Sequence, residues 1–275
     1  MAHRFVAGEA LDEAIAAARV CNELGMLVSL DYLGENVAST ADAQHSRDAY
    51  LEVFEKIATN RINANVSCKL TALGLDLNTE FCEGLALSIV ERAAAYDNFL
   101  RVDMEGSIYT QRTIEIVKRV RAQNPAIGTV IQAYLYRSEK DVQDLLAYGC
   151  RIRLCKGAYK ESAEVAFERK ADVDANYVRL VKMLLPSGFY HGIATHDPKM
   201  IGATIRCAAE NKISKEDFEF QMLYGVRTDL QRLLVRDGYR VRVYIPYGQD
   251  WFPYFMRRLA ERPANIGFFL RNFFR

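Results

Sequence analysis

The chain has 275 residues, half of them apolar, which is enough for one large buried core and fits a single domain spanning residues 1–275. Thirty-six basic residues against thirty-five acidic ones leave a formal net charge of +1, so no overall field draws the protein to nucleic acid or to an anionic membrane. No apolar run approaches the roughly 20 residues that span a bilayer, and the N-terminus lacks a signal peptide's pattern, so we expect a cytoplasmic protein with a small-molecule partner.

Short β-rich runs alternate with longer helical runs along the whole chain. The intervening stretches have a helical period and are rich in Ala, Leu, Glu and Arg, as in residues 42–60, 79–96 and 110–123. Strand and helix in regular alternation predict parallel strand pairing. The eight candidate strands are Leu27 to Leu33, Asn65 to Thr71, Phe99 to Glu105, Gly128 to Leu135, Arg151 to Gly157, Phe189 to His196, Phe218 to Tyr224 and Arg240 to Tyr247.

Two architectures satisfy this alternation. A doubly wound open sheet that binds dinucleotides would show GxGxxG after its first strand, and the sequence has no such motif. Eight regular units within this length favour a closed barrel. The sequence therefore predicts an α/β fold, a single (β/α)8 barrel of the TIM type.

The barrel fixes where function is expected, because active sites of this fold lie at the C-terminal ends of the strands and in the loops that follow. The residues at these positions are unusually polar for strand ends. They are Asp31 and Glu35, Lys69, Asp103 and Glu105, Gln132 and Tyr136, Arg153 and Lys156, Thr195 and His196, Gln221 and Tyr224, and Tyr244.

The run after the last candidate strand, YGQDWFPYFMRRLAERPAN, is typical of a turn followed by a helix. Tyr254, Arg257, Arg258 and Glu261 fall at i, i+3, i+4 and i+7, so they share one helical face. Two neighbouring guanidinium groups favour a carboxylate or phosphate, which they bind through paired hydrogen bonds. The alternative is a solvated basic face paired with Glu261. The position after a strand end favours the anion clamp.

Arg153 and Lys156 stand where the fifth candidate strand reaches Gly157. Glycine lets backbone N–H groups approach an anion closely, so this run suits a phosphate-bearing cofactor, unless the basic strand end is simply solvated. At the next strand end, Asp197 is expected to cap a helix. His196 either binds a metal, acts as a base, contacts a cofactor or is merely hydrogen-bonded.

Charges of both signs close neighbouring strands at Lys69, Asp103 and Glu105. Buried charges persist when they are paired, so these residues form either a network around a zwitterionic substrate or a structural ring of salt bridges.

Other chemistries find little support. The six cysteines form no CxxC pair and mostly lie in apolar patterns, so we expect reduced core residues, and with the four histidines they show no metal-ligand spacing. The sequence has no serine nucleophile elbow, Walker-type phosphate loop or paired-carboxylate spacing. Covalent and metal-assisted hydrolysis are therefore disfavoured.

Six runs carry a family resemblance. They are LRVDMEGS, VIQAYLYRS, RIRLCKGAY, IATHDPKM, EFQMLYGV and RVYIPYGQDWFPYFMRRLAERPAN, one per successive barrel unit. In this order they resemble the bacterial proline dehydrogenase family over essentially the whole chain, and the length resembles its stand-alone members more than those fused to an aldehyde dehydrogenase. The resemblance implies a distorted barrel with the last helix over its mouth. It also implies FAD-dependent oxidation of L-proline to 1-pyrroline-5-carboxylate, with electrons passed to a membrane quinone.

The resemblance also implies roles for individual residues. Arg257 and Arg258 would hold the proline carboxylate, and Glu35 would close over the substrate by pairing with this clamp. Asp103 and Arg153 are the expected catalytic residues, with Arg153 stabilising the reduced flavin electrostatically. The remaining expected contacts are Lys69, Tyr244 and Tyr254 around the substrate, Gln132 and Met104 beside the flavin ring, and Lys156, Gly157, Ala158, Thr195 and His196 along the rest of FAD.

Some features stay open at this stage. Cys155, Asp197 and Gln249 stand where the family commonly has valine, asparagine and glutamate. Hydroxyproline or a folate is an alternative substrate, and an amino-acid-binding barrel without flavin is an alternative function. A homo-oligomer and a peripheral membrane contact remain open. The terminal run IGFFLRNFFR either packs on the barrel, which we favour, or forms an amphipathic surface helix.

Overall fold

The computed structural model describes residues 5–252, 254 and 256, and its strands close into one parallel barrel. Each strand pairs with the next along the chain, and β1 pairs with β8. The predicted α/β barrel of the TIM type is confirmed. The strands are β1 (Leu27–Tyr32), β2 (Ala64–Cys68), β3 (Leu100–Val102), β4 (Ile127–Gln132), β5 (Arg151–Cys155), β6 (His191–Ala194), β7 (Phe218–Leu223) and β8 (Arg240–Tyr247).

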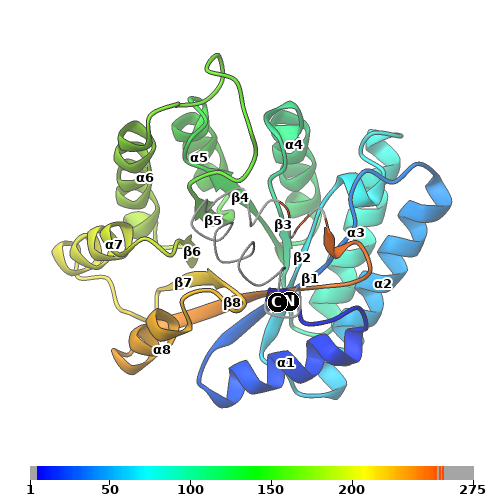
Figure 1. Ribbon diagram of the computed structural model, residues 1–275. Coiled ribbons are helices and arrows are strands. Elements are labelled where there is room, and N and C mark those ends of the chain that lie inside the picture. The colour runs from blue at the N-terminus through cyan, green and yellow to red at the C-terminus, as the bar shows by residue number, and fades with distance from the viewer. Residues whose placement is uncertain (1–4, 253, 255, 257–275) are drawn as a thin grey trace, which may run out of the picture.

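Helices surround the barrel on its outside (Figure 1). They include the three predicted helical stretches, of which the first begins at Thr40 because the Ser39 hydroxyl accepts the Asp42 N–H at its N-terminus. The helices with defined bounds are α1 (Leu11–Glu23), α2 (Thr40–Thr59), α3 (Thr79–Ala95), α4 (Ser107–Gln123), α5 (Ser138–Ala147), α6 (Lys170–Leu184), α7 (Pro198–Glu210) and α8 (Thr228–Arg236), with short 3-10 helices η2 (Thr71–Leu73) and η3 (Leu185–Ser187).

The barrel departs from a regular (β/α)8 arrangement at its seam, the place where β1 pairs with β8. Helix α1 precedes the first strand and packs against β1 and β8, which is where the eighth helix of a regular barrel lies. The chain after β8 turns helical at Trp251, and Tyr254 is only 5% exposed. The seam is therefore covered by α1, and the helix after β8 contributes to the barrel mouth instead.

Several predicted strands end earlier in the structure than expected. The second was predicted to reach Thr71 but ends at Cys68, and the third was predicted to reach Glu105 but ends at Val102. Beyond these points only the Asp103 N–H still donates to a neighbouring strand end, the Cys68 carbonyl at 2.8 Å, and side-chain hydrogen bonds take over. The N–H and hydroxyl of Thr71 donate to the Glu105 carboxylate at 3.2 and 2.5 Å.

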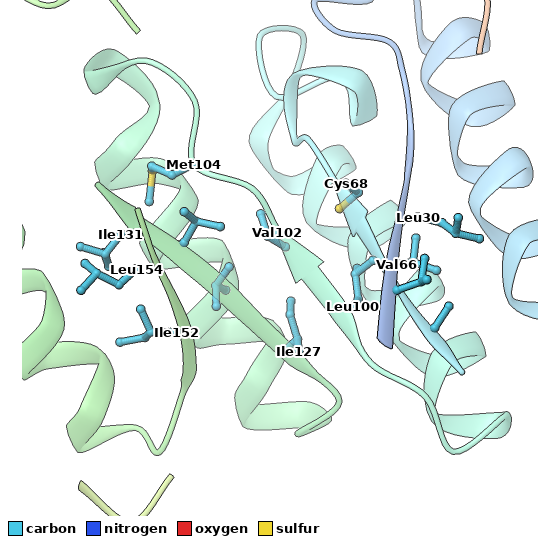
Figure 2. Close-up of a cluster of buried hydrophobic side chains, with 14 of the residues drawn as sticks. Leu30, Val66, Cys68, Leu100, Val102, Met104, Ile127, Ile131, Ile152 and Leu154 are labelled. Carbon is cyan, nitrogen blue, oxygen red and sulfur yellow. The ribbon is translucent and has the colours of Figure 1, made fainter. Parts of the chain in front are cut away.

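The main apolar core lies between the strands and the helices. Apolar side chains from β1 to β5, such as Leu30, Val66 and Leu154, form one buried cluster, which Figure 2 shows in close-up. Many of the alternate strand positions, such as Ser29 and Arg153, face the barrel interior and are polar or charged. A hydrogen-bonded interior thus supports the residues at the barrel mouth.

Five of the six cysteines are buried and all are free, as expected. Cys155 differs, since it is half-buried and lines the cavity described below. Within the described part of the chain, no helix combines the length and the apolar character needed to cross a membrane.

Candidate active site

A cavity of about 630 Å³ opens at the C-terminal ends of the strands. Its volume lies within the range of small-molecule and cofactor sites. The structure brings most of the predicted site residues together around it. Those lining it are Lys69, Asp103, Met104, Gln132, Arg153, Lys156, Gly157, Ala158, Thr195, His196, Tyr244 and Tyr254.

Three predicted residues are not among the lining. Arg257 and Arg258 of the expected clamp lie outside the described residues, and so does Glu261, their partner in the alternative of a solvated basic face. Glu35 follows β1 as predicted and is half-buried, and it carries contacts of its own.

Arg153 is the centre of the site's hydrogen-bond network. Its Nη1 donates to Asp103 Oδ1 at 2.7 Å, and its Nη2 donates to the hydroxyls of Ser67 and Ser29 at 3.0 and 3.2 Å. Its Nε donates to Oε1 of Gln221. Four of the five guanidinium N–H groups thus have protein acceptors, which holds the group in one orientation.

Asp103 links this guanidinium to an aromatic ring. Its second oxygen, Oδ2, accepts the hydroxyl of Tyr244 at 2.8 Å. The ring of Tyr244 lies beneath Arg153, whose Cζ is 5.2 Å from the ring centroid. One carboxylate therefore orients both a cation and a tyrosine at the mouth of the barrel.

Lys69 and Asp31 form a buried ion pair, with Nζ and Oδ2 3.2 Å apart and side chains 6% and 0% exposed. Burial opposes the charged form of Lys69, but the carboxylates of Asp31, Asp103 and, more weakly, Glu35 outweigh it and raise the pKa of Lys69. Lys69 is therefore a permanent cation in the cavity wall. Of the charges predicted to pair at these strand ends, Lys69 pairs with Asp31 and Asp103 pairs with Arg153, whereas Glu105 accepts hydrogen bonds from Thr71.

The far end of the cavity is rich in cations. Lys156 bonds to Asp174 and, at 2.7 Å, to Asp197, while Lys170 also bonds to Asp174. Asp197 caps α7 by accepting the Lys199 N–H at 2.9 Å, as predicted. Burial would raise the pKa of Asp197, but Lys156 and the helix amide lower it to about 2. The N-terminus of α7, capped by the Asp197 carboxylate, adds a positive dipole end to this region.

Gly157 begins the loop after β5 in a conformation that side chains avoid. Its φ is +144°, and an added Cβ would lie 2.6 Å from ring carbons of Tyr134. Next to it, the N–H of Ala158 donates to Oε1 of Gln132 at 2.9 Å, and Nε2 of Gln132 donates to the Glu105 carbonyl at 3.0 Å. The glycine and the amide together bring the backbone of this loop against the cavity.

Thr195 and His196 directly follow β6 and line the cavity. Nε2 of His196 accepts the N–H of Leu223 at 2.9 Å. The Thr195 hydroxyl accepts the N–H of Asp197 at 3.0 Å. Of the roles left open for His196, hydrogen bonding is the one that the structure describes.

Some residues that line the cavity were not predicted as parts of the site. They include Tyr159, Lys170, Gln221 and Arg227. Gln221 stood out only as a polar strand end, and the other three lie in loops or at helix starts. Arg227 has a left-handed φ of 49° and pairs with Asp229 at 3.1 Å. An unusual backbone conformation of this kind leaves no reliable mark on a single sequence.

Comparisons with known proteins give the family. The family model described as proline dehydrogenase matches residues 14–271. Proline dehydrogenase 2 of Bacillus subtilis is 43% identical over 267 residues, which cover 97% of this chain and 88% of that protein. A proline dehydrogenase of Deinococcus radiodurans is 42% identical over 278 residues, covering 99% of this chain and 89% of that protein.

A solved structure agrees with these relatives. Proline utilization A (PutA) from Bdellovibrio bacteriovorus, inactivated by N-propargylglycine, superimposes with a TM-score of 0.89 at 28% identity. The superposition covers 94% of this chain but only 32% of the PutA chain, so this chain spans about a third of that protein. With the family model matching most of its length, the chain belongs to the proline dehydrogenase family.

Proposed function

We propose that the chain, as a single domain over residues 1–275, oxidises L-proline to 1-pyrroline-5-carboxylate with FAD bound in the cavity at the barrel mouth. The observation that carries this proposal is the hydrogen-bonded set of Asp103, Arg153 and Tyr244, together with the Lys69–Asp31 ion pair, in the wall of that cavity in a chain of this family. The network supplies fixed charges of both signs, which suits a zwitterionic amino acid beside a flavin.

The cavity fits FAD in size and in the chemistry of its two ends. The cations Lys156, Lys170 and Arg227 and the N-terminus of α7 suit a pyrophosphate. At the other end, Arg153, Gln132 and Met104 suit the flavin ring, and Arg153 keeps one N–H beyond the four already bonded to protein. The remaining predicted contacts, Gly157, Ala158, Thr195 and His196, also line the cavity.

The substrate would lie against Lys69, Tyr244 and Tyr254. We propose that Arg257 and Arg258 bind its carboxylate through paired hydrogen bonds, and that Glu35 closes over it by pairing with this clamp. Asp103, the predicted catalytic residue, contributes by holding Arg153 and Tyr244 in place, which makes it a positioning residue. These groups fix the ring of proline and exclude alternative poses, which is the protein's main contribution to such a reaction.

Arg153, Gln132 and Met104 would hold the flavin ring of FAD, which would supply an acceptor for the hydride from the carbon next to the proline nitrogen, while the nitrogen gives up a proton to solvent as the C=N bond forms. The chain's own groups make this transfer favourable by electrostatics, because a fixed cation at Arg153 favours electron density arriving beside it. We propose a quinone as the final acceptor, as the family resemblance implies. Turnover with a water-soluble quinone analogue in place of an artificial dye tests this part separately.

One spectrum tests the central proposal. The purified protein, supplied with FAD, is expected to be yellow and to lose its visible flavin absorbance when L-proline is added without oxygen. D-Proline is the matched control and should leave the spectrum unchanged, and hydroxyproline compared in the same way tests the alternative substrate. A colourless protein that also fails to bind added FAD would contradict the proposal.

A further inference from the structure

Two polar residues of β7, Glu219 and Gln221, connect the interior of the barrel to Arg153. They are two positions apart and 1% and 4% exposed, so both side chains point into the barrel. Oε1 of Gln221 accepts the Nε–H of Arg153, and Nε2 of Gln221 donates to Oε1 of Glu219 at 2.5 Å. Gln221 lines the cavity, whereas Glu219 lies beneath it and does not.

The surroundings of Glu219 keep it ionised. Burial would raise the pKa of this carboxyl, but Arg242, whose Nε donates to Oε1 at 2.6 Å, and Tyr190, whose hydroxyl donates to Oε2 at 2.8 Å, lower it. An ionised carboxylate can only accept hydrogen bonds. Glu219 therefore requires an N–H from Gln221, and the amide oxygen must point the other way, towards Arg153.

The reverse orientation of the Gln221 amide is excluded at both ends. It would place the amide oxygen against the Glu219 carboxylate and the amide N–H groups against the Nε–H of Arg153. In that orientation two acceptors would face each other at Glu219 and two donors would face each other at Arg153, which is costly for buried groups. The charge of Glu219 thus sets the acceptor that holds the Nε edge of Arg153.

An independent observation points to the same side chain. Gly192 of β6 pairs in register with Arg153 on one side and Glu219 on the other. A Cβ at Gly192 would lie 2.6 Å from Cδ of Gln221. The glycine therefore leaves the space in the barrel that the Gln221 side chain fills, and the interior is shaped around this amide.

We propose that Gln221 and Glu219 are positioning residues for Arg153: Glu219 fixes the Gln221 amide, and Gln221 holds the guanidinium in place at the flavin end of the cavity. This inference rests on the proposed function, since FAD is the group that Arg153 would face. The expected consequence is electrostatic. A guanidinium that is free to turn stabilises the reduced flavin less than one held by acceptors on both of its edges.

The first test replaces Gln221 with a side chain of similar length that offers no amide. In the FAD-loaded protein, Gln221→Met is expected to lower the flavin midpoint potential by about 30 mV, equivalent to a tenfold loss in preference for the reduced form. Anaerobic reduction by L-proline should slow by about the same factor. The dissociation constant for proline should change little. A potential and a reduction rate equal to those of the wild type would overturn the proposal.

A second variant covers the case in which Gln221→Met does not fold. Gly192→Ala removes no hydrogen-bonding group and displaces the Gln221 side chain, so it should lower the potential in the same direction. The role of Glu219 is tested by Glu219→Leu combined with Arg242→Leu, which removes both charges of the pair and leaves no net change. This double variant should match Gln221→Met, and a wild-type potential in it would remove Glu219 from the proposal.

Tyr190→Phe is the matched control. It removes the hydroxyl that bonds Oε2 of Glu219 but leaves the Oε1 contact to Gln221 intact. If Glu219 acts through the amide, this variant loses some stability and keeps the wild-type potential, whereas an equal drop in potential would indicate a merely structural role. The wild type separates the two proposals: without FAD binding or reduction by proline, the proposed function itself fails, before any variant is compared.

Discussion

Arg257 and Arg258 belong at the residue scale, because the proposed recognition of the substrate depends on their guanidinium groups. Removing one guanidinium that binds a carboxylate through paired hydrogen bonds weakens the free energy of binding by on the order of 2 kcal/mol. Arg258→Ala should therefore raise the KM for proline by about 30-fold. Binding of FAD should persist, because Arg257 and Arg258 are not among the predicted FAD contacts. Steady-state kinetics and the flavin spectrum of the variant check both expectations.

The control for this prediction is Arg232→Ala, which removes an exposed arginine of α8. It carries the same loss of charge and should leave the KM unchanged. An unchanged KM in Arg258→Ala and in Arg257→Ala would place the carboxylate site elsewhere in the cavity.

His191 gives the stability of the protein a pH dependence. Its ring is buried, accepts the Ile152 N–H at 3.0 Å through Nδ1 and bonds to Ser187 at 2.9 Å. Burial, aided by the charge of Arg101, lowers its pKa to about 3. Above pH 6.5 the ring is neutral in both states. Below pH 6.5 His191 binds a proton in the unfolded chain but not in the folded chain. The free energy of unfolding therefore falls by about 1.4 kcal/mol for each unit that the pH is lowered.

Urea unfolding at pH 7.5 and 5.0 measures this effect. His191 should contribute a loss of about 2 kcal/mol between the two, so His191→Gln should lose about that much less than the wild type. His45→Gln, at an exposed position of α2, serves as control and should retain the wild-type dependence. Equal losses in the wild type and His191→Gln would show that the ring is not held neutral.

At this scale the sequence predicted the identity of site residues better than their partners. Twelve of the residues proposed from strand ends and family resemblance line one cavity, because parallel strands in a barrel end at a common rim. The pairing of Lys69 with Asp31 and the acceptors of Arg153 depend on which strands face each other across the barrel. That information is not contained in the local pattern of one chain.

Among the elements, the loop after β5 combines a strained backbone with a place in the cavity. Gly157→Ala puts a Cβ against the Tyr134 ring in a backbone conformation that costs about 1–3 kcal/mol for a side chain. The loop must shift to accommodate it, so we expect a lower thermal midpoint and about tenfold weaker FAD binding. Fluorescence titration with FAD and thermal unfolding of the apoprotein check the two effects.

Gly84→Ala is the matched substitution outside the site. Gly84 lies in α3 with nothing near its Cβ position, and a helical Gly→Ala change stabilises by up to about 1 kcal/mol. The two alanine variants should therefore change the thermal midpoint in opposite directions. Unaltered FAD affinity in Gly157→Ala would mean that Gly157 is needed for the conformation of the loop but not for FAD binding.

All eight strands were predicted in place, because β-rich runs separated by helical periods are the strongest signal that a barrel leaves in a sequence. Strand ends were predicted less well. Residues 69–71 and 103–105 have the composition of a strand, yet side-chain hydrogen bonds such as that of Thr71 to Glu105 end the sheet there. Such bonds join residues far apart in the chain, so local composition cannot reveal them.

For the whole molecule, the inside of the barrel carries the polar network and the outside carries the apolar core. The single side chain of Arg153 bonds to side chains from β1, β2 and β7 and to Asp103 after β3. A ligand that touches the cavity wall is therefore coupled to the closed sheet through these bonds. The residues outside the barrel keep the fold together, and those inside it hold the site rigid.

This arrangement predicts that FAD stabilises the barrel as a whole. At a free concentration a hundredfold above its dissociation constant, FAD should add about 2.7 kcal/mol to the free energy of unfolding. For a chain of this size the thermal midpoint should rise by roughly 5–10 °C in one cooperative transition. Differential scanning calorimetry with and without FAD measures the shift.

Lys156→Ala tests whether the cationic end of the cavity contributes to that stabilisation. The substitution leaves Asp174 and Asp197 without this partner beside the proposed phosphate site, so FAD should bind about tenfold more weakly. At the same FAD concentration, the added stability then falls to about half. Lys56→Ala removes an equal charge from α2, where Lys56 pairs with Asp12 at 2.8 Å, and should keep the full shift. A full shift in Lys156→Ala as well would show that the phosphates bind elsewhere, and two successive transitions would contradict a single coupled barrel.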